Sequence, residues 1–244
     1  MSEIYESPKL LSEYLLFHFG TAEEILPAGR NWPLGMQQAL DFPVRTVGLF
    51  SNFPAERGLD LGCAVGRSAF EMARQCREVI GIDFSHSFIR AAETLRTGSA
   101  ISYDRCEEAS LSTRLEARAP VGIDVSRLSF QQGDAMDLPT DLGSFDCVHA
   151  ANLLCRLPDP QRLLGRLPSL VKSGGELILA TPCTWLEEYT PSENWPTGST
   201  FDWLQTSLSQ DFKLMGTADE PFLIRETARK FQWTTSLVTV WQRK

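Results

Sequence analysis

The sequence lacks the patterns on which most metal-binding, disulfide-bonded and membrane proteins depend. Its six cysteines contain no Cys-x-x-Cys pair, and none of its three histidines stands at ligand spacing from a cysteine. We therefore expect no metal site and reduced, mostly buried thiols. No apolar run approaches the roughly 20 residues of a membrane-spanning helix, and the start has no signal-peptide pattern. These absences predict a cytoplasmic protein without a membrane partner.

Positive charge is also scarce. Lys and Arg number 23 against 31 Asp and Glu, which gives a net charge of −8. Binding to nucleic acids depends on a surplus of Lys and Arg, so we expect no nucleic-acid partner. The acidity does not identify a substrate, but it argues against polyanions.

What is present is an alternation of short apolar strands and helical segments. Strands are expected at Gly58–Leu61, Val79–Asp83, Leu128–Gln132, Phe145–Ala150 and Glu176–Thr181. Helices are expected at 8–19, 35–51, 67–76, 85–97 and 160–171, with Pro43 interrupting the second. This order predicts an α/β fold with a mostly parallel sheet of seven strands and helices on both faces.

Several segments depart from this alternation. Residues 98–127 form a polar insertion, residues 182–213 are rich in Trp and Pro, and Pro221–Trp241 predicts an antiparallel pair of strands joined near Lys230–Thr235. In the helix at 8–19, the apolar side chains share one face, and Lys9 and Glu13 are expected on the opposite side.

The first predicted strand runs into Asp60-Leu61-Gly62-Cys63-Ala64-Val65-Gly66. A dinucleotide loop would have the spacing G-x-G-x-x-G, which this loop does not match. The spacing resembles instead the D-x-G-x-G-x-G loop of class I methyltransferases, with Ala64 replacing the middle glycine. An alanine is tolerable at this position if its backbone dihedrals are ordinary.

The next strands end in residues that suit an adenosyl cofactor. Asp83 follows Gly62 by 21 residues, and such a carboxylate accepts hydrogen bonds from ribose hydroxyls. The resemblance implies that Asp134 holds the adenine amino group and that the cofactor is S-adenosylmethionine. The residues expected at the cofactor are Asp60, Gly62, Cys63, Ala64, Gly66, Asp83, Phe84, Gly133, Asp134, Ala135 and Asn152.

Aromatic rings and carboxylates follow the fifth strand, in Thr181–Tyr189 and around Trp195. They suit a small, flat or cationic methyl acceptor, although rings in a long loop also serve as core. The charged run Arg225–Lys230 reads either as a solvated hairpin or as a grip on a substrate carboxylate through a forked guanidinium.

These segments together resemble one family, the methyltransferase of ovothiol biosynthesis, which methylates a ring nitrogen of thiolated histidine (4-mercaptohistidine). The resemblance rests on Lys9–His18, Gly58–Ser68, Ile80–Ser85, Ala150–Leu153, Thr184–Pro191 and Arg225–Gln232. Trp233 departs from the polar residue expected there. The family domain is commonly fused to an iron-dependent sulfoxide synthase, so a separate synthase is expected to act upstream.

The sequence has no internal repeat and no low-complexity linker, so we expect a single methyltransferase domain over 1–244. Residues 1–56 are expected to form a helical cap, 57–181 the cofactor-binding core, and 182–244 the acceptor loop and last strands. Asn152, Tyr189 or Glu187 is expected to hydrogen-bond the acceptor ring. Further substrate contacts are expected from Tyr14, His18, Trp185, Glu188, Arg225 and Arg229. The alternatives are a methyltransferase for another small metabolite, or a non-catalytic cofactor-binding partner of a synthase.

Overall fold

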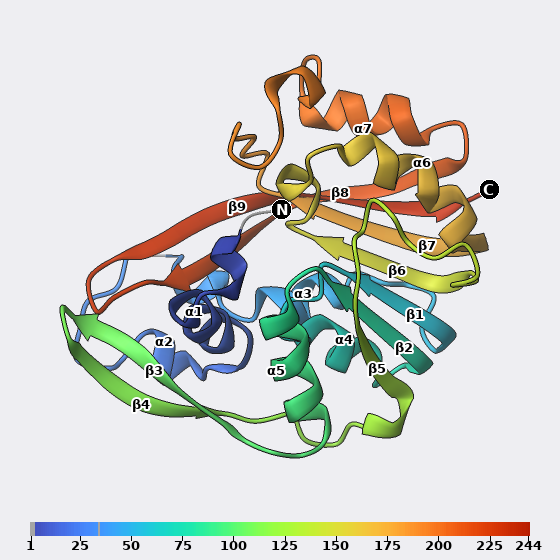
Figure 1. Ribbon diagram of the computed structural model, residues 1–244. Helices are drawn as coiled ribbons and strands as arrows, with labels where there is room; N and C mark the ends of the chain where they lie inside the picture. The colour runs from blue at the N-terminus through green and yellow to red at the C-terminus, as the bar shows by residue number, and fades with distance from the viewer. Residues whose placement is uncertain (1–2, 34) are drawn as a thin grey trace.

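A seven-stranded sheet runs through the middle of the molecule (Figure 1). Its order is β5 (Leu128–Gln132), β2 (Cys76–Asp83), β1 (Ala55–Leu61), β6 (Phe145–Ala151), β7 (Val171–Thr181), β9 (Phe231–Arg243) and β8 (Phe212–Arg225). The pairs from β5 to β7 are parallel, and β9 is antiparallel to both of its neighbours. The computed structural model describes residues 3–33 and 35–244. The expected α/β sheet with an antiparallel C-terminal pair is confirmed.

Helices cover both faces of the sheet (Figure 1). One face carries α1 (Pro8–Phe19), α2 (Ala22–Ile25), α3 (Phe42–Val47), α4 (Arg67–Met72) and α5 (His86–Arg96), and the other carries α6 (Pro160–Leu170) and α7 (Thr200–Leu208). Successive strand side chains point to opposite faces. Leu59 and Leu61 therefore join the core under α6 and α7, whereas Asp60 points toward α3. Short 3₁₀ helices occur at Glu3–Glu6, Gln37–Ala39, Val125–Arg127, Leu154–Arg156 and Ser192–Asn194.

Local sequence explains where the long helices begin. The Ser7 hydroxyl accepts a hydrogen bond from Leu10 N–H, and Pro8 occupies the first helical position of α1, where its missing N–H costs nothing. Ser85 caps α5 in the same way through Phe88 N–H. Both helices start within one residue of the expected position. Across residues 3–33 and 35–244, no helix has the length and apolar character that crossing a bilayer requires.

Several expected boundaries were wrong, including the starts of β1, β2 and β7, which lie three to five residues earlier than expected. The helix expected at 35–51 breaks at Asp41, whose φ is 56°, because Pro43 fits only in the first turn of a helix. The helix expected at 67–76 ends at Met72, since the chain must return to pair Cys76 with Ala55 at the start of β2. The strand pair turns at 226–230 rather than at 230–235, and β8 starts at Phe212.

The polar insertion at 98–127 contains an antiparallel pair of its own, β3 (Ile101–Glu108) and β4 (Leu111–Ala117). This pair lies outside the main sheet and passes beneath α1 and α2 in the view of Figure 1. Glu107 in β3 accepts hydrogen bonds from Arg225 Nη2 (2.7 Å) and, through its main-chain oxygen, from Ala228 N–H (3.0 Å). The insertion and the C-terminal hairpin are therefore joined around the N-terminal helices.

Candidate active site

The loop between β1 and α4 has left-handed backbone at alternate residues: φ is 68° at Gly62, 48° at Ala64 and 94° at Gly66. A Cβ at Gly66 would lie 2.7 Å from the Phe130 ring, so glycine is required there. The condition under which an alanine is readily tolerated at position 64, ordinary backbone dihedrals, is not met. The alternation turns the chain sharply at the end of β1, and Ala64 adopts a conformation that side chains disfavour.

The Asp83 carboxylate is held at the end of β2 against this loop. Its Oδ2 accepts from Ala64 N–H (2.9 Å) and its Oδ1 from Ser85 N–H (2.9 Å). Burial raises the pKa of Asp83 to about 6, and the two backbone hydrogen bonds oppose that rise. The group is therefore a fixed acceptor that is ionised at neutral pH.

Asp60 belongs to a buried cluster behind the loop. His149 Nδ1 lies 2.8 Å from Asp60 Oδ1, and His149 Nε2 lies 3.0 Å from the hydroxyl of Thr46. All three side chains are buried. Asp60 Oδ2 is also buried, yet it has no hydrogen-bond partner among the described residues. Because an unpaired buried acceptor is costly, this oxygen suits a cationic or N–H-bearing ligand.

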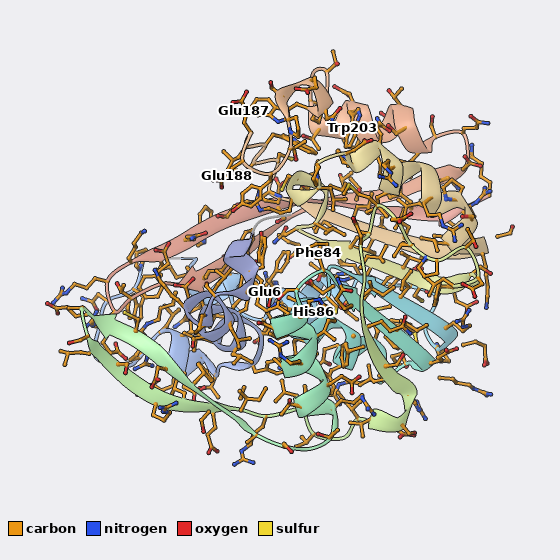
Figure 2. All side chains as sticks on the ribbon, viewed as in Figure 1. Glu6, Phe84, His86, Glu187, Glu188 and Trp203 are labelled. Atoms are coloured by element: carbon orange, nitrogen blue, oxygen red, sulfur yellow. The ribbon has the colours of Figure 1, made fainter. Side chains whose placement is uncertain are left out.

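A cavity of about 490 Å³ lies along the carboxyl ends of all five parallel strands. Ligands of open α/β sheets bind at this edge. The expected cofactor residues that line it are Asp60, Gly62, Cys63, Ala64, Asp83, Phe84, Gly133, Ala135 and Asn152. In Figure 2, Phe84 marks the end of β2 at this edge. Together with the free Asp60 oxygen and the Asp83 acceptor, this edge fits an adenosyl cofactor that carries hydroxyls and an ammonium group.

Two expected cofactor residues are not among the lining residues. Gly66 begins α4 behind the loop. The Asp134 carboxylate turns back to accept from Met136 N–H (2.8 Å). The expected contact of Asp134 with the adenine amino group therefore has no direct support from this geometry.

The other half of the cavity is formed by the two ends of the chain. One face of α1 supplies Leu10, Glu13, Tyr14, Phe17 and His18, and the last strands supply Phe222, Ile224, Gln232 and Thr234. Burial lowers the pKa of His18 to about 3, aided by the Arg67 charge, so its imidazole is neutral. Tyr14 and His18, two of the expected substrate contacts, line this half of the cavity.

Asn152 stands between the two halves. Its φ is 55°, its N–H donates to Ala180 O (2.8 Å), and its Oδ1 accepts from the Ser236 hydroxyl (2.7 Å). Tyr189 and Glu188 complete the rim, and Figure 2 shows Glu187 and Glu188 on the loop after β7. Glu187 is exposed and does not line the cavity.

The structure does not bring three other expected residues to the cavity. Trp185 donates to the Thr200 hydroxyl (3.0 Å) and packs edge-on against Trp203. Arg225 is 4% exposed and bonds Glu107 and Ile25 O (3.0 Å). Arg229 lies in the turn between β8 and β9. The expected grip of these two arginines on a substrate carboxylate is therefore not formed.

The lining residues that sequence reasoning missed include three with polar or charged side chains, Tyr5, Glu13 and Arg156. The guanidinium of Arg156 lies 4.6 Å from the centre of the Tyr189 ring and donates to Thr184 O (3.2 Å). Glu13 was expected on the solvent side of α1. Its spacing from Leu10 and Phe17, three and four residues, was the signal that it shares their face.

Comparison with known proteins agrees with this geometry. Residues 59–179 match the family model described as "Methyltransferase domain". The chain is 29% identical over 143 residues to the ubiquinone biosynthesis O-methyltransferase of Ralstonia nicotianae, covering 57% of this chain and 49% of that protein. It is 28% identical over 157 residues to the enzyme of the same name from Coxiella burnetii, covering 64% and 55%. The matches thus span about half the length of these curated relatives.

Solved structures share the fold. The N-methyltransferase NodS from Bradyrhizobium japonicum WM9, in complex with S-adenosyl-L-homocysteine, aligns with a TM-score of 0.55 and 14% identity over 96% of this chain and 98% of that one. A putative S-adenosylmethionine-dependent methyltransferase from Listeria monocytogenes aligns with a TM-score of 0.54 and 15% identity over 83% and 98%. Residues 59–179 thus resemble a methyltransferase domain, and the chain has the class I fold of S-adenosylmethionine-dependent methyltransferases.

Proposed function

We propose that this enzyme methylates an imidazole ring nitrogen of thiolated histidine, as in ovothiol biosynthesis. The observation that carries the proposal is the composition of the acceptor half of the cavity. The segments whose sequence resembles the ovothiol family supply its rim, through Thr184, Leu186, Glu188, Tyr189 and Gln232, opposite the α1 residues. The acceptor in turn requires an upstream reaction that places sulfur on the histidine ring, for which a separate sulfoxide synthase is the expected source.

The chemistry demands little acid–base catalysis from the chain. S-Adenosylmethionine supplies an activated methyl group on a sulfonium. The ring nitrogen's lone pair forms the N–C bond as the S–C bond breaks, and the methylated ring then loses a proton to water. The protein's contribution is alignment and exclusion of water, which is worth roughly 7–11 kcal/mol. A neutral His18, and Asn152 and Tyr189 at the junction of the two halves, suit this positioning role.

The test is methyl transfer from isotopically labelled S-adenosylmethionine, with thiolated histidine, histidine and cysteine offered side by side and products read by mass spectrometry. We expect label on a ring nitrogen of thiolated histidine and little on the other two. Label confined to histidine or cysteine, or absent from all three, would remove the proposed acceptor and leave the cofactor assignment in place.

A second candidate is O-methylation of a hydroxyl group, for instance a phenol, because the curated relatives are named O-methyltransferases. A phenolic hydroxyl is a poor nucleophile until it loses its proton, so this reaction calls for a base beside the acceptor. His18 is a weak base because its pKa is about 3, so a phenolic acceptor would have to lose its proton to another group, such as the Glu13 carboxylate. Adding a catechol to the competition separates the two, since only the second candidate predicts a methyl ether.

A further inference from the structure

The cavity-facing side of α1 carries one charged residue among apolar and aromatic ones. Leu10, Glu13, Tyr14 and Phe17 lie three, four and seven residues apart and all line the cavity. Such a stripe normally packs into a core, where a carboxylate would be excluded. The Glu13 side chain is nevertheless 11% exposed. A carboxylate at this position is therefore best explained by a role in binding a ligand in the cavity.

The Glu13 carboxylate lacks the donors that a buried charge needs. Its Oε1 is buried and has no hydrogen-bond partner among the described residues, and burial raises its pKa. Lys9 Nζ is 3.8 Å from this oxygen, beyond hydrogen-bond distance, and the Lys9 side chain is 74% exposed. Lys230, on the nearby hairpin, bonds Glu226 instead (2.6 Å). Glu13 also borders a second hollow beside Lys9 and the β3–β4 turn, and its long ion pair with the exposed Lys9 leaves the carboxylate available to a ligand at the cavity wall.

The charges around the cavity make a cation the fitting ligand. Its charged lining residues are four acids and one guanidinium, namely Glu13, Asp60, Asp83, Glu188 and Arg156. Asp60 and Asp83 lie beside the loop 62–66, at the cofactor half. Glu188 is exposed on the rim. Glu13 is then the one buried carboxylate on the acceptor side of the cavity, within the described residues, and the rings of Tyr14 and His18 lie beside it on the same helix.

We propose that Glu13 binds the ammonium group of the methyl acceptor, so that the enzyme selects small amines whose flat ring lies against Tyr14 and His18. This inference rests on the proposed function for the identity of the ring, but the amine requirement is a separate claim. The contact of Glu13 with the ammonium group of the acceptor thus replaces the contact that was expected between its carboxylate and Arg225 or Arg229. Both arginines lie outside the cavity.

The test uses two probes that differ only in the amine. Histamine carries an imidazole ring and an ammonium group, and ethylimidazole carries the same ring and chain without it. Each is titrated calorimetrically into the full chain saturated with S-adenosylhomocysteine. We expect histamine to bind the wild type at least tenfold more tightly, because a hydrogen bond between an ammonium and a carboxylate is stronger than one between neutral groups. Glu13→Gln should remove this preference and leave ethylimidazole binding within about twofold.

Two controls keep the result interpretable. Glu116→Gln, on an exposed side chain of β4, should keep the wild-type preference for histamine. The affinity of Glu13→Gln for S-adenosylhomocysteine should stay at the wild-type value, which shows that the sheet edge is intact. A wild type without preference for histamine overturns the proposal, and so does an equal loss of both probes in Glu13→Gln.

The two proposals can fail separately. If thiolated histidine is not methylated but the histamine preference depends on Glu13, the ring-nitrogen assignment falls and the amine subsite stands. If thiolated histidine is methylated by Glu13→Gln with an unchanged KM, the amine subsite falls and the proposed function stands.

Discussion

At the scale of single residues, the conformation of Ala64 is the clearest sign that the cofactor loop is under constraint. Its φ of 48° lies in the left-handed region, which costs an L-residue about 1–2 kcal/mol. The Ala64 N–H donates to Asp83 (2.9 Å), so the strained residue also fixes the carboxylate expected at the ribose. Strain of this kind persists where the surroundings determine the backbone.

Ala64→Gly should therefore raise the free energy of unfolding by about 0.5–1 kcal/mol, because relief of strain exceeds the added entropy of the unfolded chain. Urea unfolding measures the change. The matched control is Ala91→Gly in the interior of α5, which should lower stability by about 0.5–1 kcal/mol. If both variants lose stability equally, Ala64 is not strained.

The raised pKa of Asp83 predicts the pH dependence of cofactor binding. Hydrogen bonds from ribose hydroxyls require the ionised carboxylate, and its pKa is about 6. The dissociation constant of S-adenosylhomocysteine should be flat above pH 7 and rise toward tenfold per pH unit below pH 6, as fluorescence or calorimetric titration would measure. Asp83→Asn should bind weakly with a flat profile. A wild-type profile that stays flat to pH 4.5 would assign cofactor binding to other groups.

His18 predicts a pH effect on stability. Its folded pKa of about 3 is below the unfolded value of about 6.5. The unfolded chain therefore takes up the proton first. The contribution of the neutral His18 to the free energy of unfolding is fully retained above pH 6.5. It is lost as the pH falls from 6.5 toward 3, by at most about 1.4 kcal/mol per pH unit. His18→Gln should lose less stability between pH 6.5 and 4.5 than the wild type. His86→Gln, at the exposed start of α5 (Figure 2), should match the wild type.

At the scale of elements, the β3–β4 pair packs behind α1 and is joined to β8 by the ion pair of Glu107 with Arg225. We call the strand pair together with this ion pair the brace. Arg225 in β8 is buried, and its charge is balanced by Glu107 in β3 (2.7 Å). Removing one partner leaves a buried charge without compensation. Glu107→Ala should cost about 2–3 kcal/mol in urea unfolding, less than for a fully buried pair because Glu107 is 23% exposed. Glu116→Ala on β4, whose partner Arg118 is exposed, should change stability by less than about 0.5 kcal/mol.

The sequence predicts well those elements whose ends are marked by nearby residues, such as capping residues, proline or glycine. Ser7, Pro8 and Gly20 delimit α1, and the buried apolar runs of β5 and β6 gave strands within one residue of the structure. The brace could not be predicted in this way. Glu107 and Arg225 are 118 residues apart in the chain, and no local periodicity reports such a pair. The antiparallel pair within 98–127 was hidden because its strands are too polar to show a buried face.

The same distinction runs through the candidate site. The residues expected at the cofactor follow strands in a short, recognisable order, so the sequence could place Gly62, Asp83 and Asn152 together at one edge of the sheet, where they line the cavity. The acceptor half is formed by residues from both ends of the chain. Their common location can be recognised only in the folded structure. Arg225 is conspicuous in the sequence but is used structurally, whereas Glu13 is inconspicuous on an amphipathic helix and lines the cavity.

At the scale of the whole molecule, the cavity has two halves with different origins, and this predicts how ligands change its dynamics. The cofactor half belongs to the continuous region 59–179, and the acceptor half is made mainly by α1, the loop after β7 and the β8–β9 hairpin. Amide hydrogen exchange reports local opening, which is slowed wherever a ligand binds the closed form. Saturating S-adenosylhomocysteine should therefore slow exchange in residues 61–66 and 83–88 first.

Adding histamine to that complex should slow exchange in α1 and in residues 222–234. α6, on the opposite face of the sheet (Figure 1), should exchange at its original rate. Because α1 is held by the brace and not by the sheet alone, Glu107→Ala should reduce the histamine effect on α1 and preserve the cofactor effect on 61–66. Uniform slowing across α1 and α6 with either ligand would mean that both halves open only with the whole fold, and the separation of cofactor and acceptor sites into independent parts would not hold.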